Sequence, residues 1–227
     1  MHLLLSYPKS GRTWVFSMLG KYVSLEQGLG NTDIVRYATA NLPLTKSHAG
    51  FSIQGNLKQD RNRADSFDPE KIILLTRNPY DTVLSFYHDA KGRYNYSGDL
   101  ESFIRHPKYG ANNLKRYTEY VDSRDPRHVF SYEDIQENTF EEMKRILEIL
   151  EQPVVDSILN DAIEFCAADN LREQERLYRK DKSKGVNMKS EGNMVKVRKA
   201  KVGSYKEEMT QAQIDYIKGV MNESISN

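Results

Sequence analysis

The sequence predicts an α/β fold with three layers, in which a central parallel sheet carries a P-loop-like turn near the N-terminus. Two observations lead to this class. Short apolar runs of the kind found in buried parallel strands alternate along the chain with segments of helical periodicity. The first run, Leu3–Leu5, leads through a tight turn with Pro8 and Gly11 into a helical pattern. Parallel strands bring their carboxyl ends to one edge of a sheet, and ligands bind there.

Each element is predicted from its local pattern. After Leu3–Leu5, strands are expected at 42–47, with Pro43 tolerated at its edge, and at 71–76 and 128–132. Asn78 and Pro79 end the strand at 71–76 and begin a helix. Apolar spacing predicts helices over 15–23, 80–90, 140–150 and 154–163. A long polar helical region is expected over 100–121, and a last helix with Thr210 as N-cap. The polar stretches 59–68 and 180–201 are expected to be loops, the second long and mobile.

Composition favours one domain and argues against several partners. With 227 residues and 38% hydrophobic content, the chain is expected to form a single domain over 1–227. Lys and Arg number 33 against 32 Asp and Glu, which gives no indication of nucleic-acid or membrane binding. The one cysteine, Cys166, fits a reducing compartment, and a strand that begins almost at Met1 leaves no room for a signal peptide. We therefore expect a cytoplasmic protein.

The turn after the first strand has the features of an anion site. A strand, a tight turn and a helix start aim several backbone N–H groups at one point, and Lys9 adds a positive charge. The turn is not a Walker P-loop, because Lys9 precedes Ser10 and Gly11 and the pattern Gly-x4-Gly-Lys-Ser/Thr is absent. We expect it to hold a phosphate or a similar group; an ordinary strand–turn–helix corner is the alternative.

Two further basic segments follow. Arg77 ends the strand at 71–76, where a nucleotide triphosphatase would need an acidic residue for Mg²⁺, so a second anion is favoured there. Ser85 lies one to two turns into the helix that follows, so its hydroxyl can face the same strand end. The guanidinium of Arg77 together with this hydroxyl suits a phosphate. A capping arginine and a solvated serine are the alternative. The basic run 197–206 suits a lid over an anion, although charge runs are usually solvated faces.

Together, the three segments resemble the sulfotransferases that use 3′-phosphoadenosine 5′-phosphosulfate (PAPS), especially the cytosolic type. Residues 7–14 resemble the 5′-phosphosulfate loop of that family, with Arg12 in place of the usual threonine. Residues 77–88 resemble its 3′-phosphate motif, and residues 198–206 resemble its C-terminal cofactor lid, with Ala200 where glycine is usual. The three segments occur in the family's order over nearly the whole chain.

The resemblance implies a role for each matched residue. The 5′-phosphosulfate would be held by the ammonium group of Lys9 and by the backbone amides of Ser10, Gly11, Arg12 and Thr13. The 3′-phosphate would be held by Arg77, Ser85, Arg198, Lys199 and the amide of Ala200. Adenine would stack on Trp14, Tyr132 would lie near the nucleotide, and 166–168 would stand at a further adenine contact. No metal ion is expected.

The catalytic candidate is His48, which follows the strand expected at 42–47. Thr45-Lys46-Ser47-His48 resembles the family's Lys-Thr-His segment, whose histidine is the general base. An acceptor hydroxyl must lose its proton as it attacks sulfur, and a neutral imidazole titrates near working pH. Lys9 and Lys46 would stabilise the charge that builds on the leaving nucleotide. A packing or surface histidine is the alternative.

These implications predict an enzyme that moves the sulfuryl group of PAPS to a hydroxyl, or an amine, and releases 3′-phosphoadenosine 5′-phosphate (PAP). The acceptor would be a small molecule or a glycan. A P-loop-type nucleotide kinase and a non-catalytic nucleotide-binding module are the alternatives. A homodimer is left open, because the family's C-terminal dimerisation pattern is matched only in part, at Lys206, Thr210 and Asp215.

Overall fold

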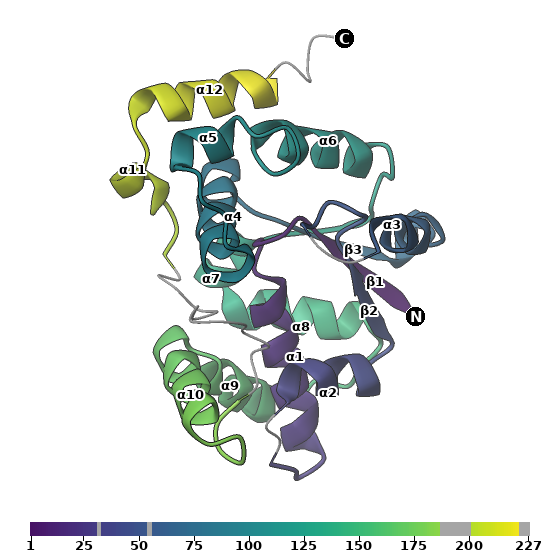
Figure 1. Ribbon diagram of the computed structural model, residues 1–227. Coiled ribbons are helices and arrows are strands. Elements are labelled where there is room, and N and C mark those ends of the chain that lie inside the picture. Colours follow the sequence, from purple (N-terminus) through teal and green to yellow (C-terminus); the bar gives the residue numbers. More distant parts are fainter. Residues whose placement is uncertain (31–32, 54–55, 187–200, 223–227) are drawn as a thin grey trace. The chain divides into compact units, whose positions relative to one another are not determined.

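The computed structural model describes residues 1–30, 33–53, 56–186 and 201–222 (Figure 1). The chain divides into two compact units that alternate along the sequence. The first unit consists of the described residues of 1–2, 11–45 and 133–200, and the second of those of 3–10, 46–132 and 201–227. Each unit is described by itself.

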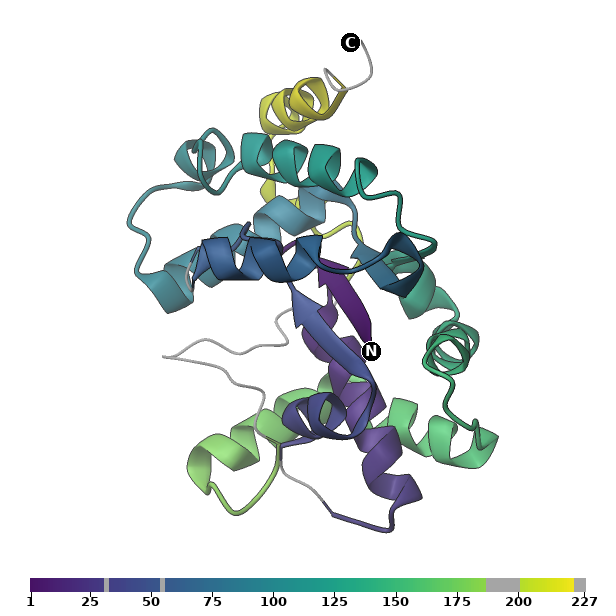
Figure 2. The ribbon, with the colours of Figure 1, turned by 90° about the vertical axis from the view of Figure 1, so that its right-hand side faces the viewer.

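Four strands form one sheet in the order β2-β1-β3-β4 (Figures 1 and 2). The strands are β1 (His2–Ser6), β2 (Leu44–Ser47), β3 (Ile72–Thr76) and β4 (His128–Ser131). β3 runs parallel to both of its neighbours, with Ile72 opposite Leu3 and Ile73 opposite His128. All five residues of β1 are buried, as expected for a parallel strand covered on both faces. The predicted α/β class with a parallel central sheet is confirmed.

The first unit is helical apart from its share of the strands. Its helices are α1 (Arg12–Glu26), α2 (Ile34–Asn41), α8 (Thr139–Ile149), α9 (Asp156–Phe165) and α10 (Ala168–Lys180), and α7 (Tyr132–Glu137) begins at its boundary. α1 packs against α2, α8 and α9. Gly20 allows the close approach of α1 and α2, because a Cβ there would lie 1.8 Å from the carbonyl oxygen of Ile34. The apolar residues that predict α1 are all buried: Val15, Met18, Leu19, Tyr22 and Val23.

The second unit surrounds one face of β1 and β3, where Leu3, Leu5, Ile72 and Leu74 enter its core. Its helices are α3 (Leu57–Asp65), α4 (Pro79–Tyr94), α5 (Leu100–Ile104), α6 (Ala111–Asp122), α11 (Tyr205–Glu208) and α12 (Gln211–Asn222), with a 3₁₀ turn at Pro69–Lys71. The C-terminal helix α12, yellow, lies beside α5 and α6 in both ribbon views (Figures 1 and 2).

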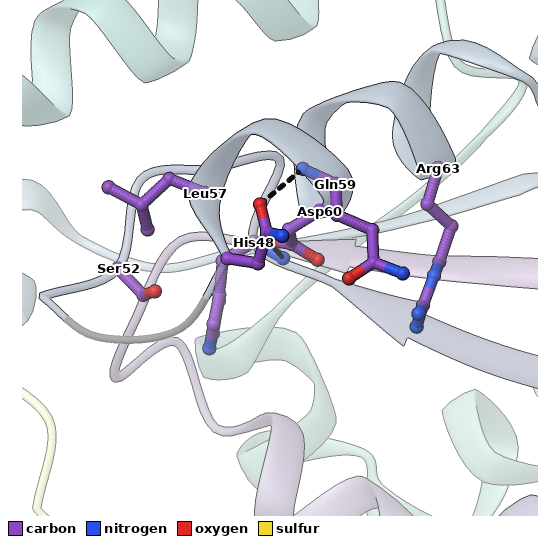
Figure 3. A pocket seen from close by; sticks show the side chains of 7 residues that line it. His48, Ser52, Leu57, Gln59, Asp60 and Arg63 are labelled. Carbon is purple, nitrogen blue, oxygen red and sulfur yellow. Dashed lines mark hydrogen bonds between the residues drawn. The ribbon is translucent and has the colours of Figure 1, made fainter.

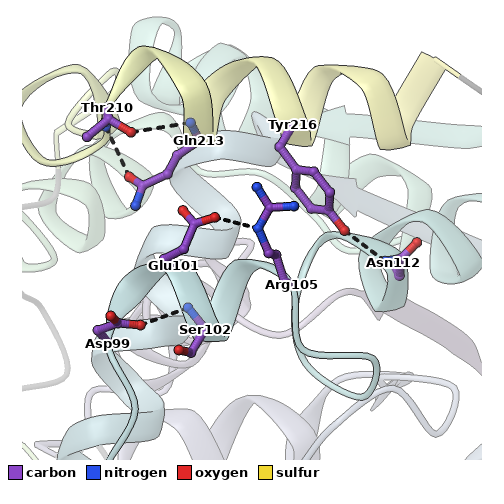
Figure 4. Close-up of polar contacts among 8 residues, drawn as sticks. All are labelled: Asp99, Glu101, Ser102, Arg105, Asn112, Thr210, Gln213 and Tyr216. Atoms are coloured by element: carbon purple, nitrogen blue, oxygen red, sulfur yellow. Dashed lines mark hydrogen bonds and ion pairs between the residues drawn. The ribbon is translucent and has the colours of Figure 1, made fainter.

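Polar side chains support the packing of α12. The guanidinium of Arg105 lies 4.1 Å from the centre of the Tyr216 ring and also pairs with Glu101 (Figure 4). Asn112 Nδ2 donates to the Tyr216 hydroxyl at 3.4 Å. Thr210 caps α12 as predicted, since its Oγ1 accepts from the backbone N–H of Gln213 at 3.3 Å.

Two sequence-based predictions about loops and helices are wrong. The stretch 59–68 is not a loop, because most of it lies in α3, which Asn56 caps by accepting from the N–H of Gln59 at 3.0 Å. Only Ala64 of α3 is buried, so the helix has no apolar stripe for a pattern search to find. The stretch 100–121 is not one helix: Pro107 and Gly110 separate α5 from α6.

Other boundaries differ in smaller ways. β4 ends at Ser131, and Tyr132 begins α7 instead of closing the strand. The helix α10 has no counterpart among the predicted elements, and it ends at Lys180. Of the loop expected at 180–201, residues 187–200 lie outside the described residues.

Candidate active site

The turn after β1 has an unusual backbone and a rigid anchor. Lys9 has a φ of 74° and Gly11 a φ of 93°, and such left-handed angles are uncommon for a lysine. The N–H of Ser10 donates to the Tyr7 carbonyl at 3.3 Å. The buried Tyr7 hydroxyl accepts from Asn113 Nδ2 at 2.9 Å and donates to the Tyr109 carbonyl at 3.2 Å. The side chain that precedes the turn is thus held by α6 and its N-terminal loop.

Lys9 is a largely buried cation in the second unit, with 14% of its side chain exposed. Its Nζ lies 3.2 Å from Asp89 Oδ1 on α4, and Arg93 approaches the same oxygen at 3.9 Å. Burial lowers the pKa of the Lys9 ammonium, Asp89 opposes that shift, and the nearby charges of Arg93 and Arg77 add to it. A cation with so little water around it interacts strongly with any anion that reaches it.

Arg77 lies beside Lys9, as the parallel sheet predicts. Arg77 Nη1 donates to the carbonyl of Lys9 at 3.0 Å, and its guanidinium covers the ring of Tyr132 at 4.4 Å. Arg77 Nε is buried and has no hydrogen-bond partner among the described residues, which is the state expected of a donor that awaits an anion. Ser85 is half-buried on α4. The first two basic segments therefore meet at one edge of the sheet.

His48 lies just after β2 and is held in one tautomer. Its Nδ1 is 2.6 Å from the carbonyl oxygen of Ser6, the last residue of β1. A carbonyl can only accept, so the proton is assigned to Nδ1 and the lone pair to Nε2. This is the tautomer in which Nε2 can take up a proton. Lys46, on β2, is half-buried in the same unit.

Asp60 of α3 organises the backbone around His48. Its Oδ2 accepts from the N–H of His48 at 3.1 Å and from the N–H of Gly50 at 3.0 Å. Its Oδ1 accepts from Ser47 Oγ at 2.8 Å. No local pattern in the sequence marks Asp60 as a site residue, because the stretch that contains it has the composition of a surface loop.

A pocket of about 280 Å³ opens beside His48 (Figure 3). Apart from His48, its lining comes from α3 and the segment that leads into it: Ser52, Asn56, Leu57, Gln59, Asp60 and Arg63. One apolar side chain, Leu57, is among them. The pocket lies entirely within the second unit.

The remaining predicted residues of the first loop belong to the first unit. Gly11 precedes α1 as its N-cap, and Arg12, Thr13 and Trp14 form the first turn. Trp14 Nε1 donates to the Cys166 carbonyl at 3.0 Å, so the two segments expected to contact adenine do meet. The Cys166 thiol is buried, and burial raises its pKa to about 12. Arg198, Lys199 and Ala200 lie outside the described residues.

The described part of the predicted lid is attached to α4 through Asp81. The buried Asp81 carboxylate accepts from the N–H of Gly203 at 2.6 Å, from Ser204 Oγ at 3.0 Å and from the N–H of Tyr205 at 3.0 Å. The Tyr205 ring also stacks on Tyr80, with 4.8 Å between the ring centres. Sequence reasoning missed Asp81, because an acidic residue in the first turn of a helix is common for helix-dipole reasons alone.

The described ranges contain no group of three or more His, Cys, Asp or Glu side chains that could hold a metal ion. None of their helices has the length and apolar character needed to cross a membrane.

Comparison with known proteins places the chain in a family. The family model for a sulfotransferase domain matches residues 62–227, well over half of the chain. Sulfotransferase 6B1 of Danio rerio is 23% identical, over 93% of this chain and 73% of that protein. Cytosolic sulfotransferase 6 of Arabidopsis thaliana is 22% identical, over 99% of this chain and 78% of that protein.

Solved structures show the same fold. Mouse sulfotransferase SULT7A1, complexed with PAP, matches with a TM-score of 0.64 and 17% identity, over 99% of this chain and 84% of that one. Retinol dehydratase in a complex with retinol and PAP matches with a TM-score of 0.63 and 16% identity, over 99% of this chain and 81% of that one.

Proposed function

Because this chain belongs to the sulfotransferase domain family, we propose that it transfers the sulfuryl group of PAPS to an acceptor hydroxyl and releases PAP. One observation supports this more than any other: a cation pair and a base lie at the end of one strand. Lys9 and Arg77 are joined by a hydrogen bond just beyond β1, and His48 is bonded to Ser6, the last residue of β1. The acceptor is a small molecule.

The residues of the second unit suit the anionic groups of PAPS. Bound PAPS would supply the sulfuryl group and a bisphosphate leaving group. Lys9 would hold the 5′-phosphosulfate, together with the amides of 10–13. Arg77 and Ser85 would hold the 3′-phosphate, and the buried Nε of Arg77, which has no hydrogen-bond partner in the described part of the chain, fits that role. Arg198, Lys199 and Ala200 would complete that site, and Trp14 would stack on adenine.

The proton of the acceptor goes to His48. Nε2 takes it as the acceptor oxygen forms its bond to sulfur and the bond from sulfur to the bridging oxygen breaks. The Ser6 carbonyl keeps the other proton on Nδ1 and so holds the ring in the tautomer of a base. Lys9 stabilises the negative charge that builds on the leaving oxygen, and Lys46 adds to the positive field. Asp60 keeps the backbone of His48 in place.

The two alternatives predict different chemistry. A nucleotide kinase of the P-loop type needs an acidic residue for Mg²⁺ at the end of a neighbouring strand, whereas β3 is followed by Arg77. The family match also argues against a kinase. A non-catalytic module would have no need for a histidine whose tautomer is set. A homodimer and the cytoplasmic location remain predictions.

The test is replacement of His48 by alanine. We expect kcat/KM for sulfation to fall by about 10²–10⁴-fold, because the proton acceptor is lost. PAP affinity, measured by calorimetry, should stay unchanged, because no cofactor contact is removed. Turnover is measured with the best acceptor among 2-naphthol, glucose and glucuronate.

His128→Ala is the matched control, since His128 is a half-buried histidine on β4 that has no role in the proposed site. It should keep full activity. Near-normal sulfation by His48→Ala would rule out His48 as the base. Loss of PAP binding in His48→Ala would show that the histidine acts through the cofactor site instead.

A further inference from the structure

We propose that the pocket beside His48 binds a small, hydroxyl-rich acceptor that carries an anionic group, and that Arg63 binds that group. The inference rests on the proposed function, because it assumes that His48 is the base that the acceptor approaches. It goes further in that it names the chemical class of the acceptor.

The lining of the pocket is polar. Six of its seven lining residues carry a polar side chain, and Leu57 is the exception. A volume of about 280 Å³ is near the lower end of the range for small-molecule sites. An apolar acceptor, such as the retinol in the complex of one structural relative, would cover the side chains of Gln59 and Arg63 without offering them a hydrogen bond. A compact acceptor with several hydroxyl groups would satisfy them.

One face of α3 forms most of the pocket wall. Asn56, Gln59, Asp60 and Arg63 recur at spacings of three and four residues, which places their side chains on the same side of a helix. Asn56 caps the first turn of α3, and Asp60 binds the backbone N–H of His48. These two contacts fix the position of the helix beside His48. In Figure 3 the side chains of His48, Gln59 and Arg63 extend toward the same side.

Arg63 provides positive charge that the described part of the chain does not neutralise. Its side chain is exposed, and it forms no ion pair with any described residue. Arg61 differs, since its guanidinium is packed 4.6 Å from the Phe51 ring centre and 3.9 Å from that of Tyr120. Asp60, the carboxylate of the pocket, already accepts three hydrogen bonds from the His48 loop. The guanidinium fork of Arg63 is suited to a carboxylate, phosphate or sulfate group.

Glucose and glucuronate make a matched pair of probes, because they differ only in a hydroxymethyl group against a carboxylate. We expect the protein saturated with PAP to bind glucuronate about tenfold or more tightly than glucose, measured by ligand-observed NMR titration. Arg63→Met should abolish this preference, and Arg63→Lys should retain part of it. Lys58→Met is the control: Lys58 is an exposed cation of α3 outside the pocket lining, and its removal should leave the preference unchanged.

Equal affinity for the two sugars, or a preference that Arg63→Met keeps, would overturn the inference. Turnover gives a second readout: a higher kcat/KM for 2-naphthol than for glucuronate would also overturn it. A thermal shift with PAP in the same samples separates this failure from that of the proposed function. If PAP stabilises the protein while glucuronate is not preferred, only the acceptor class is wrong; if PAP does not bind, the proposed function itself fails.

Discussion

At the scale of single residues, Lys9 shows how a largely buried charge is balanced by the groups around it. Its ammonium lies among one carboxylate, Asp89, and two guanidinium groups, Arg77 and Arg93. Burial and the two arginines destabilise the charged form, and the carboxylate stabilises it. The net excess of positive charge in this cluster is what an incoming phosphate would neutralise.

The lowered pKa of Lys9 predicts a pH dependence of PAP binding. Because Lys9 loses its proton below the ordinary value of 10.5, PAP affinity should fall as pH rises through that lowered pKa. Between the lowered pKa and 10.5 the unfolded chain binds more protons than the folded one, so this lysine makes the fold more stable as pH rises. Weaker binding there would therefore not reflect unfolding caused by Lys9. Calorimetric titrations with PAP from about pH 7 to about pH 10 measure the effect.

Lys9→Arg is the informative variant, because a guanidinium stays charged across that range. We expect its PAP affinity to be nearly independent of pH. Parallel pH profiles for the parent protein and Lys9→Arg would contradict the assignment of Lys9 as the titrating group.

At the scale of elements, α4 is the support on which two parts of the site are built. Its first turn holds Gly203, Ser204 and Tyr205 through Asp81, and its later turns supply Asp89 to Lys9. His88 of α4 also pairs with Glu208 of α11 at 2.7 Å. Gly203, Ser204 and Tyr205 belong to the segment 198–206 that is predicted to form the cofactor lid. A helix with a strong N-cap, Asn78, and Pro79 at its first position suits such a supporting role.

Asp81→Ala should lower both stability and cofactor affinity. Three buried or half-buried donors lose their acceptor, which predicts a loss of about 3 kcal/mol in the free energy of unfolding, measured by urea titration. PAP affinity should also fall, because Gly203, Ser204 and Tyr205, which belong to the predicted lid, would lose their attachment to α4. Asp156→Ala is the control, since Asp156 occupies the first turn of α9 but is exposed. Asp156→Ala should lower the free energy of unfolding by no more than about 1 kcal/mol. An unchanged urea midpoint for Asp81→Ala would contradict the prediction.

At the scale of the whole molecule, the identity of the nucleotide distinguishes the family function from a kinase. The family match covers 62–227, so the first loop and His48 fall outside it. The curated relatives extend the similarity over 93% and 99% of the chain, but this chain spans only 73% and 78% of their lengths. The choice of nucleotide therefore has to be tested on the protein itself.

A thermal-shift comparison of PAP with ATP and Mg²⁺ makes that test. PAP at about a hundred times its dissociation constant should stabilise the fold by about 2.7 kcal/mol, because a ligand that binds only the folded state adds its binding free energy. ATP with Mg²⁺ should give a much smaller shift, since Arg77 repels a divalent cation at the phosphate site. A larger shift with ATP and Mg²⁺ than with PAP would favour the kinase.

The order of residues along the chain was enough to predict the α/β class, the parallel strands, the helix α1 and the basic segments around Lys9 and Arg77. These features depend on apolar runs, helical spacing and Pro or Gly breakers, all of which act over a few neighbouring residues. The partners of the site residues were decided by packing alone. His48 and Ser6 are 42 positions apart, and Asp81 and Ser204 are 123 apart. No local pattern encodes such pairs, because they form only when separate elements are brought together. Packing also decided α3. Its residues are too polar for an apolar pattern to indicate a helix, and the contacts of Asn56 and Asp60 stabilise it.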